Sequence, residues 1–297
     1  MAALIDAPVN SLPSVGLRAM VGAGVQYSGL EPLSGSNPRR WLQGWQFETG
    51  PCANVLQQGG ICVQERSFSP GSPTYYSGEA ITVEAQIKCS TFASQEELKQ
   101  YAVQEFERRL FGKISAEIWS GTQARANITA GKTSYSANRW LARSDHATTA
   151  VTTINGGTKL QLTEALAQLD SSILASEEAG NGLIHVPYKV MTYLGANGHL
   201  IDPVGPRRNT WNGTGVVAES GYAGTGPDTA ANGPSAAPAI DEIWIYGTGP
   251  IVIHAAADLS AIESVDIEQN DFNVTVSGAY VYGWGCTHYA VLADLVP

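Results

Sequence analysis

Gly131, Lys132 and Thr133 stand together in the order of residue types that ends a phosphate-binding loop. In such loops backbone amides hold the phosphate oxygens and the lysine ammonium neutralises their charge. The motif also needs a glycine five positions before its second glycine, and this chain has Ala126 there. The preceding residues, RANIT, make a poor buried strand. We therefore interpret the triplet as an ordinary turn and expect no nucleotide site.

Histidines and cysteines are the side chains that most often bind transition metals, and here neither type is grouped. The sequence has no HExxH, no HxH and no CxxC spacing, so we expect no metal site. The expected state of the cysteines is a reduced thiol, with a loop disulfide between Cys52 and Cys62 as the open alternative. The residues concerned are His146, His185, His199, His254, His288, Cys52, Cys62, Cys89 and Cys286.

The chain also lacks the usual pattern of a nucleophilic or acid–base enzyme. No G-x-S-x-G elbow is present. The acidic pairs Glu96-Glu97, Glu177-Glu178 and Asp241-Glu242 stand where a solvated face or a helix N-terminus explains them. We expect no catalytic residue and no cofactor, and we predict that the protein is not an enzyme.

The charge balance bears on the class of partner. The net charge is −10 and the basic pairs Arg39-Arg40, Arg108-Arg109 and Arg207-Arg208 are isolated, which argues against a nucleic-acid binder. Only 15% of the residues are charged, against about 25% in an average soluble domain. No basic signal region and no uninterrupted apolar stretch of about 18 residues is present, so we expect no membrane partner. This composition suits a protein that covers much of its surface with copies of itself.

The elements begin with an N-terminal segment of about 40 residues that is rich in Pro, Gly and Ser and lacks periodicity, which predicts an extended arm. The strand-like runs WLQGWQFE and EAITVEAQIK then flank a long Gly/Pro/Ser stretch. This pattern is typical of a long hairpin. A connection of such length is often functional, and we expect this one to reach a neighbouring molecule.

A long helix follows the hairpin. Ser94 and Glu97 form a capping box, and apolar residues at three- and four-residue spacing then predict one buried helix face over about 94–120. We expect Gly112 to allow a bend or close packing, and Trp119 to anchor the end of the helix in the core. The predicted apolar face consists of Val103, Phe106, Leu110, Ile114 and Ile118.

The remaining chain predicts a mixed lobe and then long strands. Residues 122–157 read as irregular, 159–180 as a second helix, GLIHVP as a strand and YKVMTYLGANG as a third helix. Near the C-terminus, residues 272–277 alternate, and the aromatic residues at 280, 282 and 284 share one face. Ser277-Gly278 between them is a turn or bulge signal.

This order of elements resembles the major capsid proteins of tailed bacteriophages, whose fold is shared with encapsulins. ITVEAQIKCSTFAS and EFERRLFGKISAEIWSG resemble the two ends of the family's spine helix. GLIHVPYKVMTYL and IWIYGTGPIVIH resemble the axial-domain core of capsid proteins from phages of actinobacterial hosts, and SVDIEQNDFNVTVSGAYVYGWGCTHYAVLADL resembles the last peripheral strands. The resemblance implies an α+β fold. The implied parts are an N-terminal arm (1–42), an extended β-hairpin loop or E-loop (43–88), a peripheral domain with the spine helix (89–157 and 256–297) and an α/β axial domain (158–255).

The implied function is a major capsid protein that forms hexamers and pentamers of an icosahedral shell around packaged double-stranded DNA. The implied partners are other copies of the chain, a portal and a separate scaffolding protein, with decoration proteins an open question. The implied location is the virion, after assembly in the cytoplasm of a bacterial host. Two alternatives stay open: an encapsulin-like nanocompartment, and an α/β enzyme with an unrecognised site.

Overall fold

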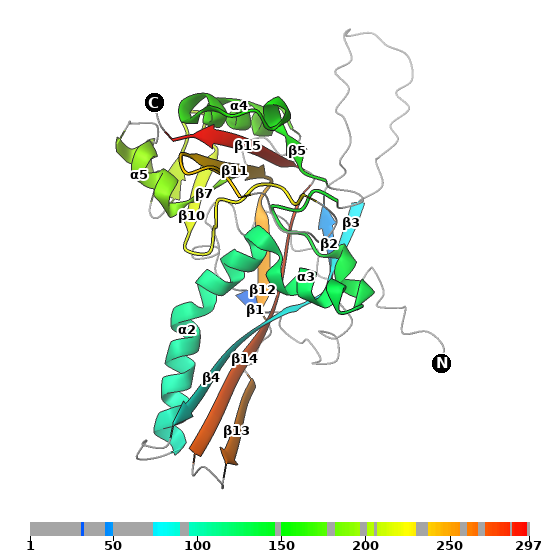
Figure 1. Cartoon of the computed structure of the whole chain (residues 1–297), viewed down its shortest axis with the longest axis vertical. Helices are drawn as coiled ribbons and strands as arrows, with labels where there is room; N and C mark the ends of the chain where they lie inside the picture. The colour runs from blue at the N-terminus through cyan, green and yellow to red at the C-terminus, as the bar shows by residue number, and fades with distance from the viewer. Residues whose placement is uncertain are drawn as a thin grey trace, which may run out of the picture.

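The structure is a computed structural model, and its described part contains two large β-sheets, a two-stranded ribbon and one long helix (Figure 1). The two sheets lie at different levels of an elongated molecule, and the long helix α2 runs beside the lower one. The described residues are 31–32, 45–49, 74–89, 95–145, 150–176, 182–196, 201–204, 207–229, 237–255, 260–266, 271–285 and 287–295.

The lower sheet has five strands built around one long central strand, β14. On one side β14 pairs with β4, and β13 and β12 also pair with it, all antiparallel. The short β1 pairs in parallel with β12. The strand bounds are β1 Glu31–Pro32, β4 Ile81–Cys89, β12 Ile251–Ala255, β13 Ser260–Asp266 and β14 Asp271–Trp284.

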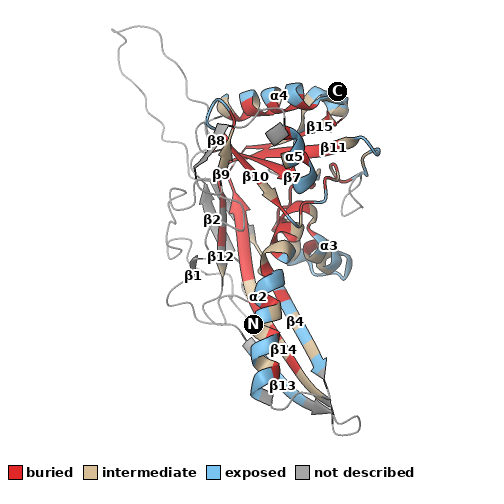
Figure 2. Cartoon of the chain, turned by 90° about the vertical axis from the view of Figure 1, so that its left-hand side faces the viewer, coloured by how far each residue is buried: buried red, intermediate tan, exposed pale blue. Residues whose placement is uncertain are grey.

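The long helix is confirmed as α2, Gln95–Ser120. Four of the five predicted apolar residues are buried and Val103 is half-buried, because this face packs on β4 and β14. Burying such side chains contributes about 25 cal/mol per Å² of apolar surface removed from water, so this face is what fixes the helix to the sheet. The opposite face of the helix is exposed (Figure 2).

β14 overturns the expected turn or bulge at Ser277-Gly278. Its pairing with β4 runs from Phe272–Cys89 to Tyr280–Ile81 without a register shift. The prediction was wrong because the continuous pairing with β4 outweighs the weakening that a glycine causes inside a strand. Gly278 itself pairs with Val83 of β4.

The upper sheet has eight strands in the order β5-β15-β11-β7-β10-β9-β8, with β6 also pairing with β15. Helix α4 lies along β15 and β11, and helix α5 contacts β7 and β10. Figure 2 shows the strands of this sheet largely buried and the outer side of α4 exposed. The bounds are β5 Thr152–Thr153, β6 Leu160–Gln161, α4 Leu162–Leu174, β7 Leu183–Pro187, α5 Tyr188–Ala196, β8 Ile201–Val204, β9 Arg207–Asn209, β10 Gly215–Glu219, β11 Glu242–Thr248 and β15 His288–Asp294.

Two sequence expectations about helices need correction. The stretch expected to be irregular begins with helix α3, Thr122–Thr129, followed by a 3-10 turn at Thr133–Ala137. The second predicted helix begins at Leu162 and not at residue 159, because Leu160 and Gln161 pair with β15 as a strand. The strand and the third helix predicted next are confirmed as β7 and α5.

The long hairpin is also corrected in one respect. β2, Trp45–Thr49, pairs antiparallel with β3, Thr74–Gly78, and this two-stranded ribbon is the described part of the loop. The run EAITVEAQIK, expected to be the second arm, instead forms β4 and pairs with β14. The alternation of β4 explains the difference, since Ile81 and Val83 are buried beneath α2 and need a sheet behind them.

The division into arm, loop, peripheral and axial parts stays a prediction, and the strand pairing differs from it at two places. β15, expected with the peripheral part, pairs with β11 in the upper sheet. β12, expected with the axial part, pairs with β14 in the lower sheet. Apart from β1, the N-terminal arm lies outside the described residues.

Candidate interaction site

The Gly131-Lys132-Thr133 triplet ends helix α3, as the turn interpretation predicts. The Gly131 amide donates to the Ile128 carbonyl (2.9 Å) and the Lys132 amide to the Asn127 carbonyl (2.9 Å). This pair of bonds is the Schellman ending of a helix, and Gly131 has the positive φ of 84° that the motif requires. The Lys132 ammonium donates to the Asn127 side chain (3.0 Å). The end of helix α3 therefore explains the glycine, without a phosphate site.

Two of the histidines have described side chains, and both are buried in hydrogen-bonded positions. His288 Nε2 lies 2.9 Å from the Leu141 carbonyl. His185 lies between the Tyr222 hydroxyl, 3.0 Å from Nδ1, and the Thr248 hydroxyl, 2.7 Å from Nε2. Burial, together with the charge of His288, lowers the pKa of His185 to about 3.

The tautomer of His185 follows from its partners. Thr248 donates its single proton to the Gly249 carbonyl (2.7 Å), so it accepts a hydrogen bond from the Nε2–H group of His185. Nδ1 is then the acceptor of the Tyr222 hydroxyl proton. The ring is thus neutral and fully engaged, which leaves no free nitrogen for a metal or a substrate.

The other residues tested for chemistry are not brought together in the described part of the chain. That part holds no cluster of three or more His, Cys, Asp or Glu side chains placed to bind a metal. Glu96 and Glu97 lie in the first turn of α2, and Glu242 lies 3.6 Å from the Lys159 ammonium. His146, His199, the Glu177-Glu178 pair and the Cys52–Cys62 alternative lie outside the described residues, as do the side chains of His254, Cys89 and Cys286.

No helix in the described ranges has the length and apolar character needed to cross a membrane.

Trp119 anchors the end of α2, as predicted. Its ring is fully buried, and its Nε1–H group lies 3.2 Å from both the carbonyl and the hydroxyl oxygen of Thr225. The ring lies 4.9 Å from that of Tyr246 in an edge-on arrangement and 5.0 Å from that of Tyr222. Because Tyr246 belongs to the upper sheet, Trp119 joins the end of the spine to that sheet.

The segment 221–229 fills this joint, which the sequence did not predict. Its glycines allow close approach: a Cβ at Gly226 would lie 2.3 Å from Trp244 Nε1. Asp228 is buried, and its carboxylate accepts the Trp140 indole proton (2.8 Å) and lies 3.4 Å from Arg125. The Gly-rich composition of this segment does not indicate these contacts, because each of them is made with a residue distant in sequence.

Glu117 is a buried acidic residue that organises the turn between α2 and α3. Its two carboxylate oxygens accept the backbone amides of Gln123 (2.7 Å) and Ala124 (2.9 Å) in the first turn of α3. These amides lack partners within the helix, and a carboxylate also interacts favourably with the helix dipole there. Burial raises the pKa of Glu117, while the two amides act in the opposite direction.

Two side-chain amides hold the backbone where the β2–β3 ribbon joins β4. The Asn138 amide accepts from the Glu79 N–H (2.7 Å) and donates to the Glu79 carbonyl (2.9 Å). The Gln123 amide makes the same pair of bonds with Thr82, at 2.8 and 3.0 Å. Each side-chain amide thus makes the two backbone hydrogen bonds that a residue of a neighbouring strand would otherwise make. We call these two contacts the amide clamps; they fix the root of the hairpin to α3 and the turn after it.

Asn138→Asp tests the inner clamp. Aspartate keeps the acceptor for the Glu79 amide but removes the donor to the Glu79 carbonyl, and Asn138 is buried. An unpaired buried carbonyl beside a carboxylate lowers the free energy of unfolding by about 2 kcal/mol. We expect this loss in urea unfolding, with faster amide hydrogen exchange at residues 79–82. Gln123→Glu, at the more exposed clamp, is the matched variant and loses less; equal losses would contradict the assignment.

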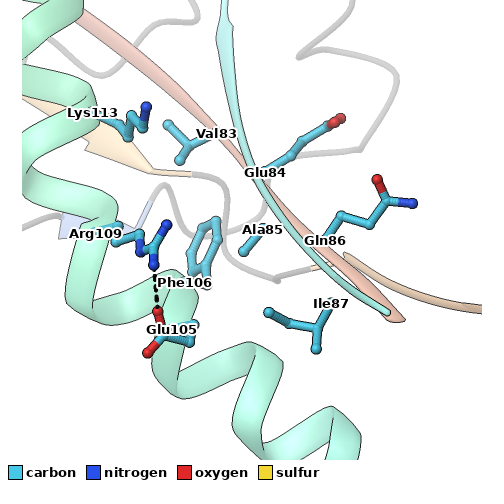
Figure 3. A pocket seen from close by; sticks show the side chains of 9 residues that line it. All are labelled: Val83, Glu84, Ala85, Gln86, Ile87, Glu105, Phe106, Arg109 and Lys113. Atoms are coloured by element: carbon cyan, nitrogen blue, oxygen red, sulfur yellow. Dashed lines mark ion pairs between the residues drawn. The ribbon is translucent and has the colours of Figure 1, made fainter. Parts of the chain in front are cut away.

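A groove lies between α2 and β4 in the lower part of the molecule (Figure 3). It has a volume of about 260 Å³. Val83, Ala85 and Ile87 from the strand, with Phe106 from the helix, form its apolar walls. Arg109 and Lys113 stand on the helix side, where Arg109 also pairs with Glu105 at 3.1 Å.

The groove combines apolar walls with cationic side chains on an acidic protein. Two carboxylates, Glu84 and Glu105, also line the groove, so its two cations make the lining formally neutral on a chain whose net charge is −10. Such a surface fits an apolar segment that carries polar groups along its edge. The alternation of β4 and the four-residue spacing of Arg109 and Lys113 are sequence signals for this groove, but the sequence analysis did not predict it.

The comparisons with known proteins identify the fold. No family model matches the chain, and no curated protein matches it either. Among solved structures, the capsid of Ralstonia phage GP4 matches 99% of this chain and 97% of its own, with a TM-score of 0.50 and 9% identity. The match to the capsid of the native GTA particle covers 95% of this chain and 91% of that chain, with a TM-score of 0.49 and 9% identity. The match to the holo-SrpI encapsulin complex from Synechococcus elongatus covers 76% of this chain and 78% of that chain, with a TM-score of 0.44 and 10% identity. The chain therefore has the α+β fold of a phage capsid protein.

Proposed function

We propose that the chain is the major shell-forming protein of a tailed-phage capsid, a structural protein and not an enzyme. The observation that carries the proposal is the likeness to the GP4 capsid, which spans nearly the whole of both chains. A match of that extent leaves no room for an added catalytic domain within these residues. Hexamers and pentamers of this subunit would form an icosahedral shell in the virion, assembled in a bacterial host.

The distribution of polar groups supports this proposal. Three buried polar residues of the described chain complete hydrogen bonds inside the fold: Glu117 caps the start of α3, Asp228 accepts an indole proton and His185 bonds two hydroxyls. These three groups are thus engaged within the fold and do not stand free as a reactive group would. Function then lies on the outer surfaces, where copies of the chain would meet.

The molecule enclosed by the shell distinguishes a phage capsid from the encapsulin-like alternative. We propose that this shell encloses double-stranded DNA. An acidic subunit, with net charge −10, does not hold a polyanion tightly. This property suits a shell that DNA enters and leaves. We propose that separate scaffolding and portal proteins assist the assembly of this shell.

Electron microscopy of the purified chain, expressed with its neighbouring phage genes, tests the proposal. We expect closed icosahedral particles with nuclease-resistant double-stranded DNA when the packaging proteins are present. Small shells that hold protein and no DNA would favour the nanocompartment. A chain that stays monomeric in every preparation would contradict a shell function altogether.

The groove between α2 and β4 is the surface that we propose receives an extended segment of a neighbouring copy. Reversal of its two cations in an Arg109→Glu/Lys113→Glu double variant should leave the subunit folded, since both side chains lie on the exposed side of α2. Assembly should weaken about tenfold in the subunit concentration required, as expected for the loss of one or two rim charge contacts. Light scattering measures this concentration. Lys132→Glu, an exposed cation in the turn after α3, is the control and should assemble normally.

A further inference from the structure

A second hollow, on the upper lobe, combines a buried carboxylate with an exposed tryptophan. It has a volume of about 160 Å³ and lies between the outer side of α4 and the turn before β10. Asp170 lines it from the helix and is only 3% exposed. Trp211 lines it from the turn and is 76% exposed. Thr163 and Ala167 complete the helix side.

The Asp170 carboxylate has polar partners but no cation among the described residues. One oxygen accepts the Asn212 amide (2.8 Å) and the other accepts the Thr214 hydroxyl. Both donors are neutral. A buried carboxylate is strongly favoured by a nearby positive charge, because its own hydration has been lost. The described fold thus places this carboxyl group beneath the hollow with only neutral donors beside it.

Trp211 supplies the second half of a cation site. An exposed indole is unusual on a surface that meets only water, and indole is the aromatic group that attracts cations most strongly to its face. The other tryptophans whose side chains are described, Trp119, Trp140, Trp244 and Trp284, are all buried. Carboxylate and indole therefore line one hollow and favour the same kind of occupant.

We propose that this hollow, bounded by Thr163, Ala167, Asp170 and Trp211, binds a lysine or arginine side chain of a second copy of the chain. The proposal rests on the shell function, which would place copies side by side and so provide the cation. Charge complementarity supports the choice of occupant: an acidic subunit with net charge −10 assembles more readily where a cation of one copy meets a carboxylate of the next. Trp211 would be covered in the assembled shell.

Charge at the helix side of the hollow tests the chemistry of the occupant. Ala167 is exposed on α4, so Ala167→Lys and Ala167→Gln both keep a good helix former there and add a side chain of similar length. We expect Ala167→Lys to raise the subunit concentration needed for assembly about tenfold above that of Ala167→Gln, through repulsion of the incoming cation. Equal assembly of the two variants, with unchanged thermal unfolding, would overturn the proposal.

Hydroxyl-radical footprinting of the unaltered protein tests the position of the contact. Trp211 should be oxidised rapidly in unassembled subunits and at least about tenfold more slowly in shells, as expected for a side chain at a water-excluded contact. Ile240, which is 87% exposed on another turn, serves as the comparison site. Particles in which Trp211 stays as reactive as in the subunit would overturn this proposal and leave the shell function intact. A chain that forms no particles at all would contradict both.

Discussion

Gly221→Ala should lower the free energy of unfolding by about 3 kcal/mol, near the upper end for overpacking in a closely fitted site. A Cβ at this position would lie 2.2 Å from the Ala116 backbone nitrogen and 2.4 Å from the Gly112 carbonyl oxygen. Both atoms belong to the backbone of α2 and cannot rotate away. The Gly221 amide also donates to the Ser115 hydroxyl (3.1 Å), a bond that a displaced segment would lose.

Gly112→Ala is the matched control, because it changes the other side of the same contact. A Cβ at Gly112 would lie 2.9 Å from the Ser220 hydroxyl oxygen, and that exposed side chain can rotate. Alanine is also better than glycine inside a helix by about 1 kcal/mol. We expect Gly112→Ala to stay within about 1 kcal/mol of the original protein in urea unfolding. Similar losses in the two variants would contradict the assignment of the fixed contact to Gly221.

The position of Gly221 gives a physical meaning to Gly112. The sequence predicted a bend or close packing at this glycine, and the structure shows close packing: the segment after β10 crosses the spine over Gly112 and Ala116. Whether the spine also flexes there when a shell changes curvature stays a prediction.

Acid should destabilise the protein through His185, by about 2.5 kcal/mol between pH 6 and pH 4. The folded protein holds this ring neutral, with a pKa of about 3 against an ordinary value of 6.5. Below pH 6.5 the unfolded chain therefore takes up a proton that the folded chain does not. Stability from this residue is fully present above pH 6.5, and it falls as the pH decreases until the folded protein is itself protonated near pH 3.

His185→Gln isolates this contribution. Glutamine can accept from the Tyr222 hydroxyl and donate to Thr248, but it does not titrate. The variant should be less stable at pH 7 through imperfect packing, yet lose about 2.5 kcal/mol less than the original protein between pH 6 and pH 4. Urea unfolding at a series of pH values measures the difference. Parallel curves for the two proteins would assign the acid sensitivity to other groups.

How far sequence reasoning reached can be judged from particular residues. The spine helix was predictable because Phe106, Leu110, Ile114 and Ile118 repeat at helical spacing, and periodicity of this kind depends on local geometry alone. The turn at Gly131 was predictable for the same reason. Pairing partners were not: EAITVEAQIK read correctly as a strand, but nothing within it indicates that β14, almost two hundred residues later, is its neighbour.

The contact surfaces were the least accessible part of the prediction. Asn138 and Gln123 are ordinary polar residues in sequence, and they become clamps only when Glu79 and Thr82 pass beside them. In the sequence, Asp170 is likewise one residue of a helix, and Trp211 and Asn212 are two residues of a turn. These residues line one hollow only in the folded chain, where β10 pairs in parallel with β7 and antiparallel with β9. This pairing places the turn before β10 next to α4.

β14 has a mechanical consequence. Fourteen residues at about 3.3 Å each give a rod of roughly 46 Å, unbroken at Gly278. One end pairs with β13 and β4, and the other pairs with β12 and ends at Trp284, whose ring lies 5.4 Å from that of His288 in β15. A force applied at the tip thus acts as on a lever arm whose pivot is the aromatic joint between the two sheets. By this geometry, a small rotation at Trp284 would become a displacement of several ångströms at the far end.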